Sequence, residues 1–280
     1  MNQKIVVCGA GTMGRSIAQL AAQNGYSVVL YDLQANAVQT AQLMIGEDLE
    51  RLVAKGKLNG QEKDQITSRI TYTTNTADCT GDLIIEAVVE ILEVKVELFQ
   101  CLQKHNPPST ILASNTSSIS IASIANELEH PERVAGLHFF NPATIMKLVE
   151  VVKTEHTSPQ VTDYLMNFAR SLQKTPVLCR DAPGFIVNHA ARPYYLESLY
   201  LHKKGVPLEM IDELLEQSGF KMGPFRLLDL IGNDINYAVS DIVYQQLGKP
   251  NRLQPSLIQK AMVEKGHLGR KTGKGFYDYK

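Results

Sequence analysis

The sequence predicts an α/β protein with a Rossmann-type, mostly parallel sheet and an all-helical C-terminal domain. Short β-branched runs alternate with helical patterns as far as residue 180, which is typical of βαβ units. A Pro-Gly segment at 181–184 interrupts this alternation, and the pattern beyond it is nearly all helical. We therefore expect one domain at 1–182 and a second at 183–280.

The composition is that of an ordinary globular protein. Hydrophobic residues make up 44% of the chain, charged residues 20%, and the net charge is −1. Nothing in this balance favours nucleic acid or a membrane surface as partner, and no apolar run approaches the length of a membrane span. The four cysteines show no metal-ligand spacing, and the N-terminal segment leaves no room for a signal peptide. We expect a cytoplasmic protein with reduced thiols and no metal site.

A glycine-rich turn directly after the first strand, Lys4–Cys8, is the first chemical signal. In a strand–turn–helix context the first glycine makes the tight turn and the second lets the backbone approach a pyrophosphate. The third permits close packing of the helix at 15–24, whose N-terminus favours phosphate. The residues predicted to bind a dinucleotide here are Gly9, Gly11, Thr12, Met13 and Gly14.

The second strand, Ser27–Tyr31, ends at an acid, Asp32, which lies 18 residues after Gly14. A carboxylate at this place accepts the hydroxyls of the adenosine ribose. No Arg or Lys occurs at 33–37, where a cation would bind a 2′-phosphate. The sequence therefore predicts NAD rather than NADP as the cofactor.

The segment 133–152 reads as two apolar strands joined by a turn at Asn141-Pro142. His138 closes the first strand, Glu150 lies in the second, and Thr144 is midway between them. A hairpin folded about that midpoint would place the two side chains opposite each other, with Cβ atoms roughly 4.5–5.5 Å apart. The carboxylate could then accept one imidazole N–H and leave the other nitrogen as a general base. A histidine near a strand end can also be purely structural.

Periodicity predicts the remaining elements. Further strands are expected at 82–88, 110–113 and Thr175–Arg180, and helices at 89–104 and 160–172. A polar helical hairpin is expected at 37–69, with breaks at Gly56 and Gly60. The C-terminal domain should hold helices at 184–203, 207–218, 224–247 and 256–265, followed by an exposed loop at 266–280. Polar residues at 114–118 follow a strand end, where ligands gather, and Ser118 or Ser120 can cap a helix.

Taken together, these motifs resemble the 3-hydroxyacyl-CoA dehydrogenases. The motifs are GAGTMG, EAVVE, ILASNTSS, GLHFFNP, MKLVEVV, PGFIVN, MGPF and GRKTGKGFYDY. The likeness is greatest to the bacterial short-chain branch, typified by 3-hydroxybutyryl-CoA dehydrogenase. It implies reversible NAD-dependent oxidation of an L-3-hydroxyacyl-CoA to the 3-ketoacyl-CoA, as in fatty acid β-oxidation and butanoate metabolism. It also implies that 183–280 serves the substrate pocket and a homodimer contact.

The resemblance assigns roles by position. It implies that His138 is the catalytic acid/base and Glu150 its carboxylate partner. Ser117 and Asn188 match residues that hold substrate oxygens, and Lys55, in the 37–69 arm, would meet a CoA phosphate. The residues that match the nicotinamide end are Glu90, Lys95, Asn115 and Asn141.

Two departures from the family pattern stand out. His189 follows Asn188 where the family usually has Arg, and Thr144 stands where a second proline of the turn is usual. The segment 191–195 is also similar to the 3-hydroxyadipyl-CoA dehydrogenases of aromatic (phenylacetate) catabolism, so the acyl chain length is open.

Two rival functions come from other classes of protein. A β-hydroxyacid dehydrogenase with a catalytic lysine would need Lys where Asn188 stands. A non-catalytic NAD-binding relative, such as a lens crystallin, would not need the set Ser117, His138, Glu150 and Asn188.

Overall fold

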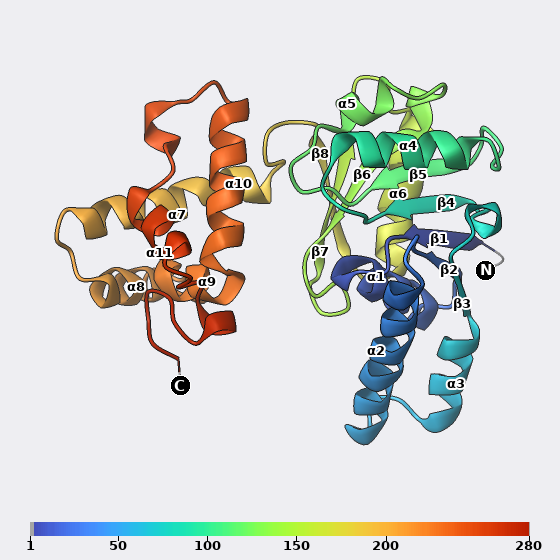
Figure 1. The fold of residues 1–280 in the computed structure, drawn as a ribbon, viewed down its shortest axis with the longest axis horizontal. Coiled ribbons are helices and arrows are strands. Elements are labelled where there is room, and N and C mark those ends of the chain that lie inside the picture. Colours follow the sequence, from blue (N-terminus) through green and yellow to red (C-terminus); the bar gives the residue numbers. More distant parts are fainter. Residues whose placement is uncertain (1–2, 280) are drawn as a thin grey trace. The chain divides into compact units, whose positions relative to one another are not determined.

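An eight-stranded sheet organises the N-terminal part of the chain (Figure 1). The structure, a computed structural model, describes residues 3–279, which divide after Asp181 into two units. The strand order is β3-β2-β1-β4-β5-β6-β7-β8, and within this sheet only β6 and β7 pair antiparallel. The predicted Rossmann-type, mostly parallel sheet is confirmed. The strands are β1 Lys4–Cys8, β2 Ser27–Tyr31, β3 Ile70–Thr73, β4 Leu83–Glu86, β5 Ile111–Ser114, β6 Val134–Phe139, β7 Leu148–Lys153 and β8 Thr175–Arg180.

Six α-helices connect these strands. They are α1 Thr12–Gln23, α2 Ala35–Ala54, α3 Gly60–Ser68, α4 Leu92–Gln103, α5 Ile121–Ala125 and α6 Pro159–Ser171, with short 3₁₀ turns at Thr76–Asp78 and Pro131–Arg133. The helices α2 and α3 form the expected hairpin and project away from the sheet (Figure 1). A capping box between Asn59 and Glu62 starts α3. Ser120 caps α5 by accepting from the Ser123 N–H, one of the two capping options the sequence offered.

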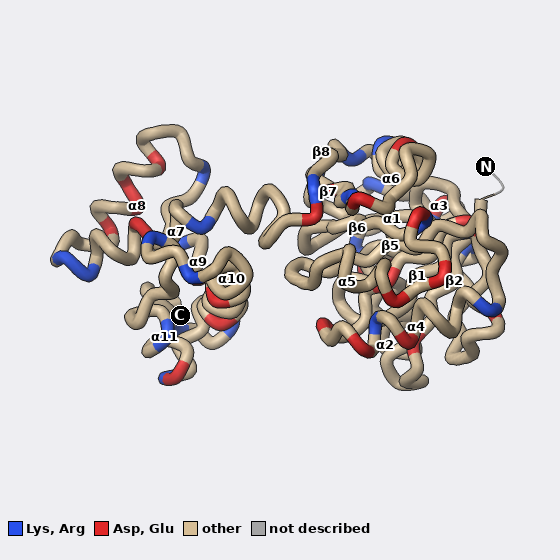
Figure 2. Tube along the Cα trace, turned by 90° about the horizontal axis from the view of Figure 1, so that it is seen from above, with Lys and Arg blue, Asp and Glu red and all other residues tan. Residues whose placement is uncertain are grey.

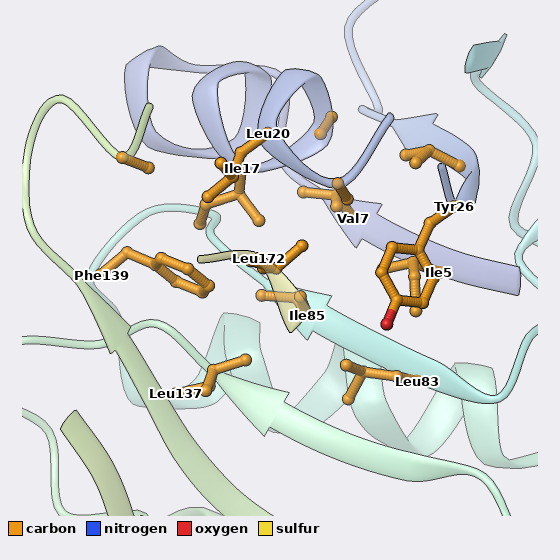
Figure 3. Close-up of a cluster of buried hydrophobic side chains, with 14 of the residues drawn as sticks. Ile5, Val7, Ile17, Leu20, Tyr26, Leu83, Ile85, Leu137, Phe139 and Leu172 are labelled. Carbon is orange, nitrogen blue, oxygen red and sulfur yellow. The ribbon is translucent and has the colours of Figure 1, made fainter. Parts of the chain in front are cut away.

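The core lies where the strands are covered by helices. Alternate residues of a strand point to one face, so Ile5 and Val7 of β1 join Leu83 and Ile85 of β4 in one cluster with α1 and α6 (Figure 3). The intervening residues, Val6 and Ile84, are also fully buried. Burial on both faces explains why these strands are continuous apolar runs in the sequence.

The C-terminal unit is helical, as predicted, but one expected helix is two. Its α-helices are α7 Val187–Lys203, α8 Leu208–Gln217, α9 Pro224–Ile231, α10 Asn233–Gln246 and α11 Leu257–Glu264, with 3₁₀ turns at Asn251–Leu253 and Arg270–Thr272. The prediction of a single helix at 224–247 is wrong. Gly232 adopts φ 107°, which no right-handed helix accommodates, so α9 ends there and α10 begins. Acidic and basic residues are mixed along both units (Figure 2).

The tail after residue 266, predicted as an exposed loop ending in an aromatic segment, is exposed at 270–274, but its aromatic end is packed against the domain. The Asp229 carboxylate, 1% exposed, accepts from the backbone N–H groups of Phe276 and Tyr277, each at 2.9 Å. It also accepts the Tyr279 hydroxyl at 3.1 Å. Phe276 and Tyr277 pack against the buried cluster that contains Phe225. A buried acid on α9 therefore holds the glycine-rich tail in place.

Replacing Asp229 with Ala should lower the free energy of unfolding by about 3 kcal/mol or more, because several donors lose a charged acceptor. Urea denaturation would measure the loss. Asp278→Ala is the matched control, since Asp278 lies on the same tail and only reaches Lys274 at 3.7 Å on the exposed surface. Similar losses in both variants would contradict the anchoring role of Asp229.

Candidate active site

The glycine turn after β1 has the geometry that phosphate binding requires. A Cβ on Gly14 would lie 1.7 Å from the Gly9 carbonyl oxygen, so α1 can pack against the turn only without a side chain there. A Cβ on Gly11 would meet nothing within 4 Å, which leaves the backbone open to a ligand. Gly11 caps α1 without a side-chain hydrogen bond, and Thr12 is exposed in the first turn. The helix N-terminus can therefore receive an anion.

Asp32 joins the end of β2 to this turn. Its Oδ2 accepts from the Ala10 N–H at 2.7 Å, and its Oδ1 accepts from the Gln34 N–H at 2.9 Å. The strand order reverses direction between β1 and β4, and dinucleotides bind outside the carboxyl ends of strands at such a switch point. The turn, the open Gly11 backbone and the placement of Asp32 fit NAD.

A buried ion network follows at the carboxyl end of β4. Glu86 is fully buried and accepts the Lys95 ammonium at 2.6 Å, the Ser114 hydroxyl at 2.6 Å and the Val88 N–H at 2.7 Å. Our sequence analysis did not single out Glu86. The available signal was its position as the one acid inside the apolar run LIIEAV, at a strand end.

Glu90 extends the network toward the 114–118 segment. Its carboxylate lies 3.0 Å from the Lys95 ammonium and accepts from the Thr116 hydroxyl, the Ser117 N–H and the Ser118 hydroxyl. Burial alone would raise the pKa of Glu90. The Lys95 charge and the hydroxyl hydrogen bonds outweigh burial, so this pKa lies below its ordinary value. Glu90 stays ionised and fixes the polar segment that carries Ser117.

Asn115 ties this segment to the next strand, because its side-chain oxygen accepts the Phe139 N–H at 2.9 Å. Phe139 directly follows His138 on β6. The ends of β5 and β6 are thereby held together where the imidazole lies.

The antiparallel pair β6–β7 places His138 directly opposite Glu150, as the hairpin midpoint predicted. The His138 Nδ1 and Glu150 Oε2 atoms are 2.6 Å apart, and the two residues are 5% and 1% exposed. When Nδ1–H donates to the carboxylate, Nε2 carries the basic lone pair of the ring. The Phe140 ring lies against the imidazole, with centroids 4.6 Å apart. The arrangement is a histidine whose tautomer and orientation are set by a buried carboxylate.

Three other predicted site residues, Asn141, Lys55 and Asn188, lie outside the buried polar contacts described above. Asn141 is exposed in the connection that follows β6. Lys55 is exposed at the C-terminal end of α2, a 20-residue helix that is about 30 Å long, and so is far from the sheet edge where Asp32 lies. Asn188 lies in the first turn of α7, in the C-terminal unit. Its side-chain amide makes no hydrogen bond to another residue that the structure describes.

The four cysteines are free thiols, and Cys8, Cys79 and Cys179 are buried. Among residues 3–279, no group of three or more His, Cys, Asp or Glu side chains is arranged to hold a metal ion. No described helix is both long enough and apolar enough to cross a membrane.

The switch-point glycine turn, the acid after β2 and the carboxylate-held histidine define an NAD-binding oxidoreductase. Two sequence-family descriptions agree with this class. The 3-hydroxyacyl-CoA dehydrogenase NAD binding domain matches residues 4–182, and the 3-hydroxyacyl-CoA dehydrogenase C-terminal domain matches residues 184–279. The chain belongs to the 3-hydroxyacyl-CoA dehydrogenase family of NAD-dependent oxidoreductases, which act on a CH–OH group.

Individual relatives cover the whole chain. It is 46% identical to 3-hydroxyadipyl-CoA dehydrogenase of Escherichia coli K12 over 99% of its length, and spans 59% of that longer protein. It is 39% identical to 3-hydroxybutyryl-CoA dehydrogenase of Clostridioides difficile over 99% of both chains. The solved structure of (S)-3-hydroxybutyryl-CoA dehydrogenase from Ralstonia eutropha is 34% identical, with a TM-score of 0.95 over 100% of both chains.

The glycine turn makes a prediction that separates packing from ligand contact. Gly14→Ala should lower the free energy of unfolding by about 1–3 kcal/mol, because the added methyl overlaps the Gly9 carbonyl. Gly11→Ala should lower the free energy of unfolding by less, since its Cβ meets open space and only the N-cap is poorer, yet weaken NADH binding. Urea melts and NADH fluorescence titration measure the two effects. Wild-type stability of Gly14→Ala would contradict the packing argument.

Proposed function

We propose that this chain catalyses the reversible NAD-dependent oxidation of short-chain L-3-hydroxyacyl-CoA, such as 3-hydroxybutyryl-CoA. The observation that carries the proposal is the His138–Glu150 contact at 2.6 Å, buried on strands of the dinucleotide-binding sheet. A relative named 3-hydroxybutyryl-CoA dehydrogenase, 39% identical over 99% of both chains, supports the substrate class.

His138 is the acid/base in this proposal. Its Nε2 takes the proton of the 3-hydroxyl group during oxidation and returns it during reduction. Glu150 holds the ring through Nδ1 and stabilises the imidazolium that forms. A positioned proton transfer of this kind supplies about 10²–10⁴ in rate. When bound, NAD accepts the hydride that leaves C3.

Ser117 and Asn188 donate hydrogen bonds to substrate oxygens that gain negative charge. The backbone N–H of Ser117 is anchored to Glu90, which would hold its hydroxyl in a constant place. The residues assigned to the cofactor are the glycine turn at 9–14, Asp32 at the adenosine ribose, and Glu90, Lys95, Asn115 and Asn141 at the nicotinamide end. The Asp32 carboxylate would repel a 2′-phosphate, which favours NAD over NADP.

The two units have separate roles in this proposal. The N-terminal domain, 1–182, binds NAD, and its arm at 37–69 covers the CoA moiety, with Lys55 at a phosphate. The C-terminal domain, 183–280, completes the substrate pocket and forms a homodimer. Its exposed apolar side chains, which include Tyr200, Leu214 and Leu257, support the proposal that a second subunit covers part of this domain's surface. Because NAD and CoA thioesters are intracellular compounds, we place the enzyme in the cytoplasm.

A second candidate substrate is a 3-hydroxyadipyl-CoA. The segment 191–195 is similar to enzymes with that activity, and the 46% identical E. coli relative carries that name. Both candidates use the same acid/base pair and differ only in the far end of the acyl chain.

A side-by-side measurement of NADH oxidation tests the reaction class. Acetoacetyl-CoA and a longer 3-ketoacyl-CoA should both be reduced, whereas free acetoacetate should not, because it lacks the CoA moiety that the arm would bind. Preference for free acetoacetate would favour a β-hydroxyacid dehydrogenase. NADH binding without turnover of any of these compounds would favour a non-catalytic relative.

The roles of His138 and Glu150 are separable. His138→Gln should nearly abolish turnover but leave NADH binding intact by fluorescence, since the glycine turn and Asp32 are unchanged. Glu150→Gln keeps the shape but deletes the charge, so kcat should fall and its pH dependence should shift. Oxidation requires neutral imidazole and reduction requires imidazolium, so the two directions should depend on pH in opposite senses. An unchanged kcat and pH profile in Glu150→Gln would rule out Glu150 as the partner.

A further inference from the structure

Arg192 on α7 is a buried guanidinium, 3% exposed, without a carboxylate partner. Its Nε donates to the Asn188 carbonyl at 2.7 Å, and its Nη1 donates to the Asn236 carbonyl at 3.2 Å and the Ser240 hydroxyl at 2.7 Å. The Tyr195 ring lies 5.1 Å from the guanidinium carbon. In the part of the chain that the structure describes, no acid lies within 4.0 Å of it.

A buried charge supported only by neutral acceptors is costly. Burial lowers the pKa of Arg192 to about 10, and no nearby carboxylate opposes this. Arg133, the comparable buried arginine, differs in that Glu129 and Glu132 raise its pKa against the effect of burial. Arg192 therefore lacks a negative charge that the other buried arginine has nearby.

One edge of the Arg192 guanidinium is also unused. Its Nη2 donates to no residue between 3 and 279, although Nε and Nη1 are both bonded. Nη2 is not among the fully buried polar atoms that lack a partner, so it keeps some exposure to solvent. By contrast, the Arg133 Nε is among those atoms. Arg192 thus has an N–H₂ group that is not fully buried and has no partner among residues 3–279, beside a buried positive charge.

The neighbour one helical turn before Arg192 is Asn188, the residue proposed to hold a substrate oxygen. Residues i and i+4 share a helix face and are separated by one turn, about 5.4 Å. The terminal carboxylate of a six-carbon dicarboxylic acyl chain lies three C–C bonds beyond C3, roughly 4 Å when extended. Asn188 and Arg192 therefore lie on one face of α7, so a single acyl chain held at its 3-oxygen by Asn188 would extend toward Arg192.

We propose that Arg192 is the residue that selects a terminal carboxylate, so that the substrate class includes a six-carbon 3-hydroxydicarboxylyl-CoA. The Nη2 group would donate to that carboxylate and supply the missing negative charge. This inference rests on the proposed function, because it requires Asn188 to contact the substrate. A structural role, with Nε bonded within α7 and Nη1 bridging to α10, accounts for these bonds but leaves the charge and Nη2 without a role.

A comparison of two substrates of equal chain length, one with and one without a terminal carboxylate, measures the effect of that carboxylate alone. The kcat/KM for 3-ketoadipyl-CoA and for 3-ketohexanoyl-CoA should be measured with NADH, and the wild type should prefer the dicarboxylic compound. Arg192→Gln deletes the charge and should reduce this preference about tenfold to a hundredfold, the value of a charge-assisted hydrogen bond. The kcat/KM for 3-ketohexanoyl-CoA, which has no carboxylate for Nη2, should fall by much less than that for 3-ketoadipyl-CoA. Arg192→Lys, which keeps a charge, should retain part of the preference.

Ser240→Ala is the matched control, because it removes one Nη1 acceptor but keeps the Arg192 charge and Nη2. It should retain the wild-type preference. An equal loss for both substrates in Arg192→Gln would show a structural role and overturn the proposal, as would a wild type without preference. Should Arg192→Gln not fold, the wild-type ratio and Arg192→Lys still decide the question. Failure of the wild type to reduce either compound while it reduces acetoacetyl-CoA would overturn the proposal, whereas failure with all three compounds would refute the proposed function itself.

Discussion

The single reversal of direction in the sheet is the constraint on which the candidate active site depends. Because β7 runs antiparallel to β6, the start of β7 lies beside the end of β6, and Glu150 faces His138. A shift of one residue in this register would turn Glu150 to the opposite face and leave the imidazole without its carboxylate. The register is held by fully buried neighbours on both strands, Leu137 and Val151, whose displacement would expose apolar surface.

Buried charges have different kinds of partner at three places in the molecule. At the carboxyl ends of β4 and β5, the buried ions Lys95 and Glu86 pair at 2.6 Å, and the more exposed Glu90 lies 3.0 Å from Lys95. This network needs no ligand to be satisfied, and its effect is to hold the strand ends in place. In the C-terminal unit, Asp229 is satisfied by N–H and hydroxyl donors, whereas Arg192 has neutral acceptors only.

Much of the architecture could be predicted because it depends on local patterns. The strand–glycine–helix unit and the apolar runs at β4 and β8 are short-range signals. The pairing of His138 with Glu150 could be predicted because the two residues are equally far from the middle of one turn. Elements that depend on distant partners were missed. Ile70–Thr73 forms a strand because the edge of β2 pairs with it, and the break at Gly232 follows from a backbone angle that residue patterns do not reveal.

By itself, the sequence determined the fold class, the NAD-type glycine turn with Asp32, and the facing of His138 and Glu150. Each of these three features follows from the spacing of residues along the chain. The conformational freedom of glycine, the alternation of side chains in a strand and the pairing of residues about a hairpin turn all act over short stretches of sequence. Only the tertiary structure decided that Glu86 completes an ion network, that Asp229 anchors the tail, and that Arg192 lacks a counter-charge. Those properties are set by which groups lie within about 3 Å after folding, and residues far apart in sequence supply them.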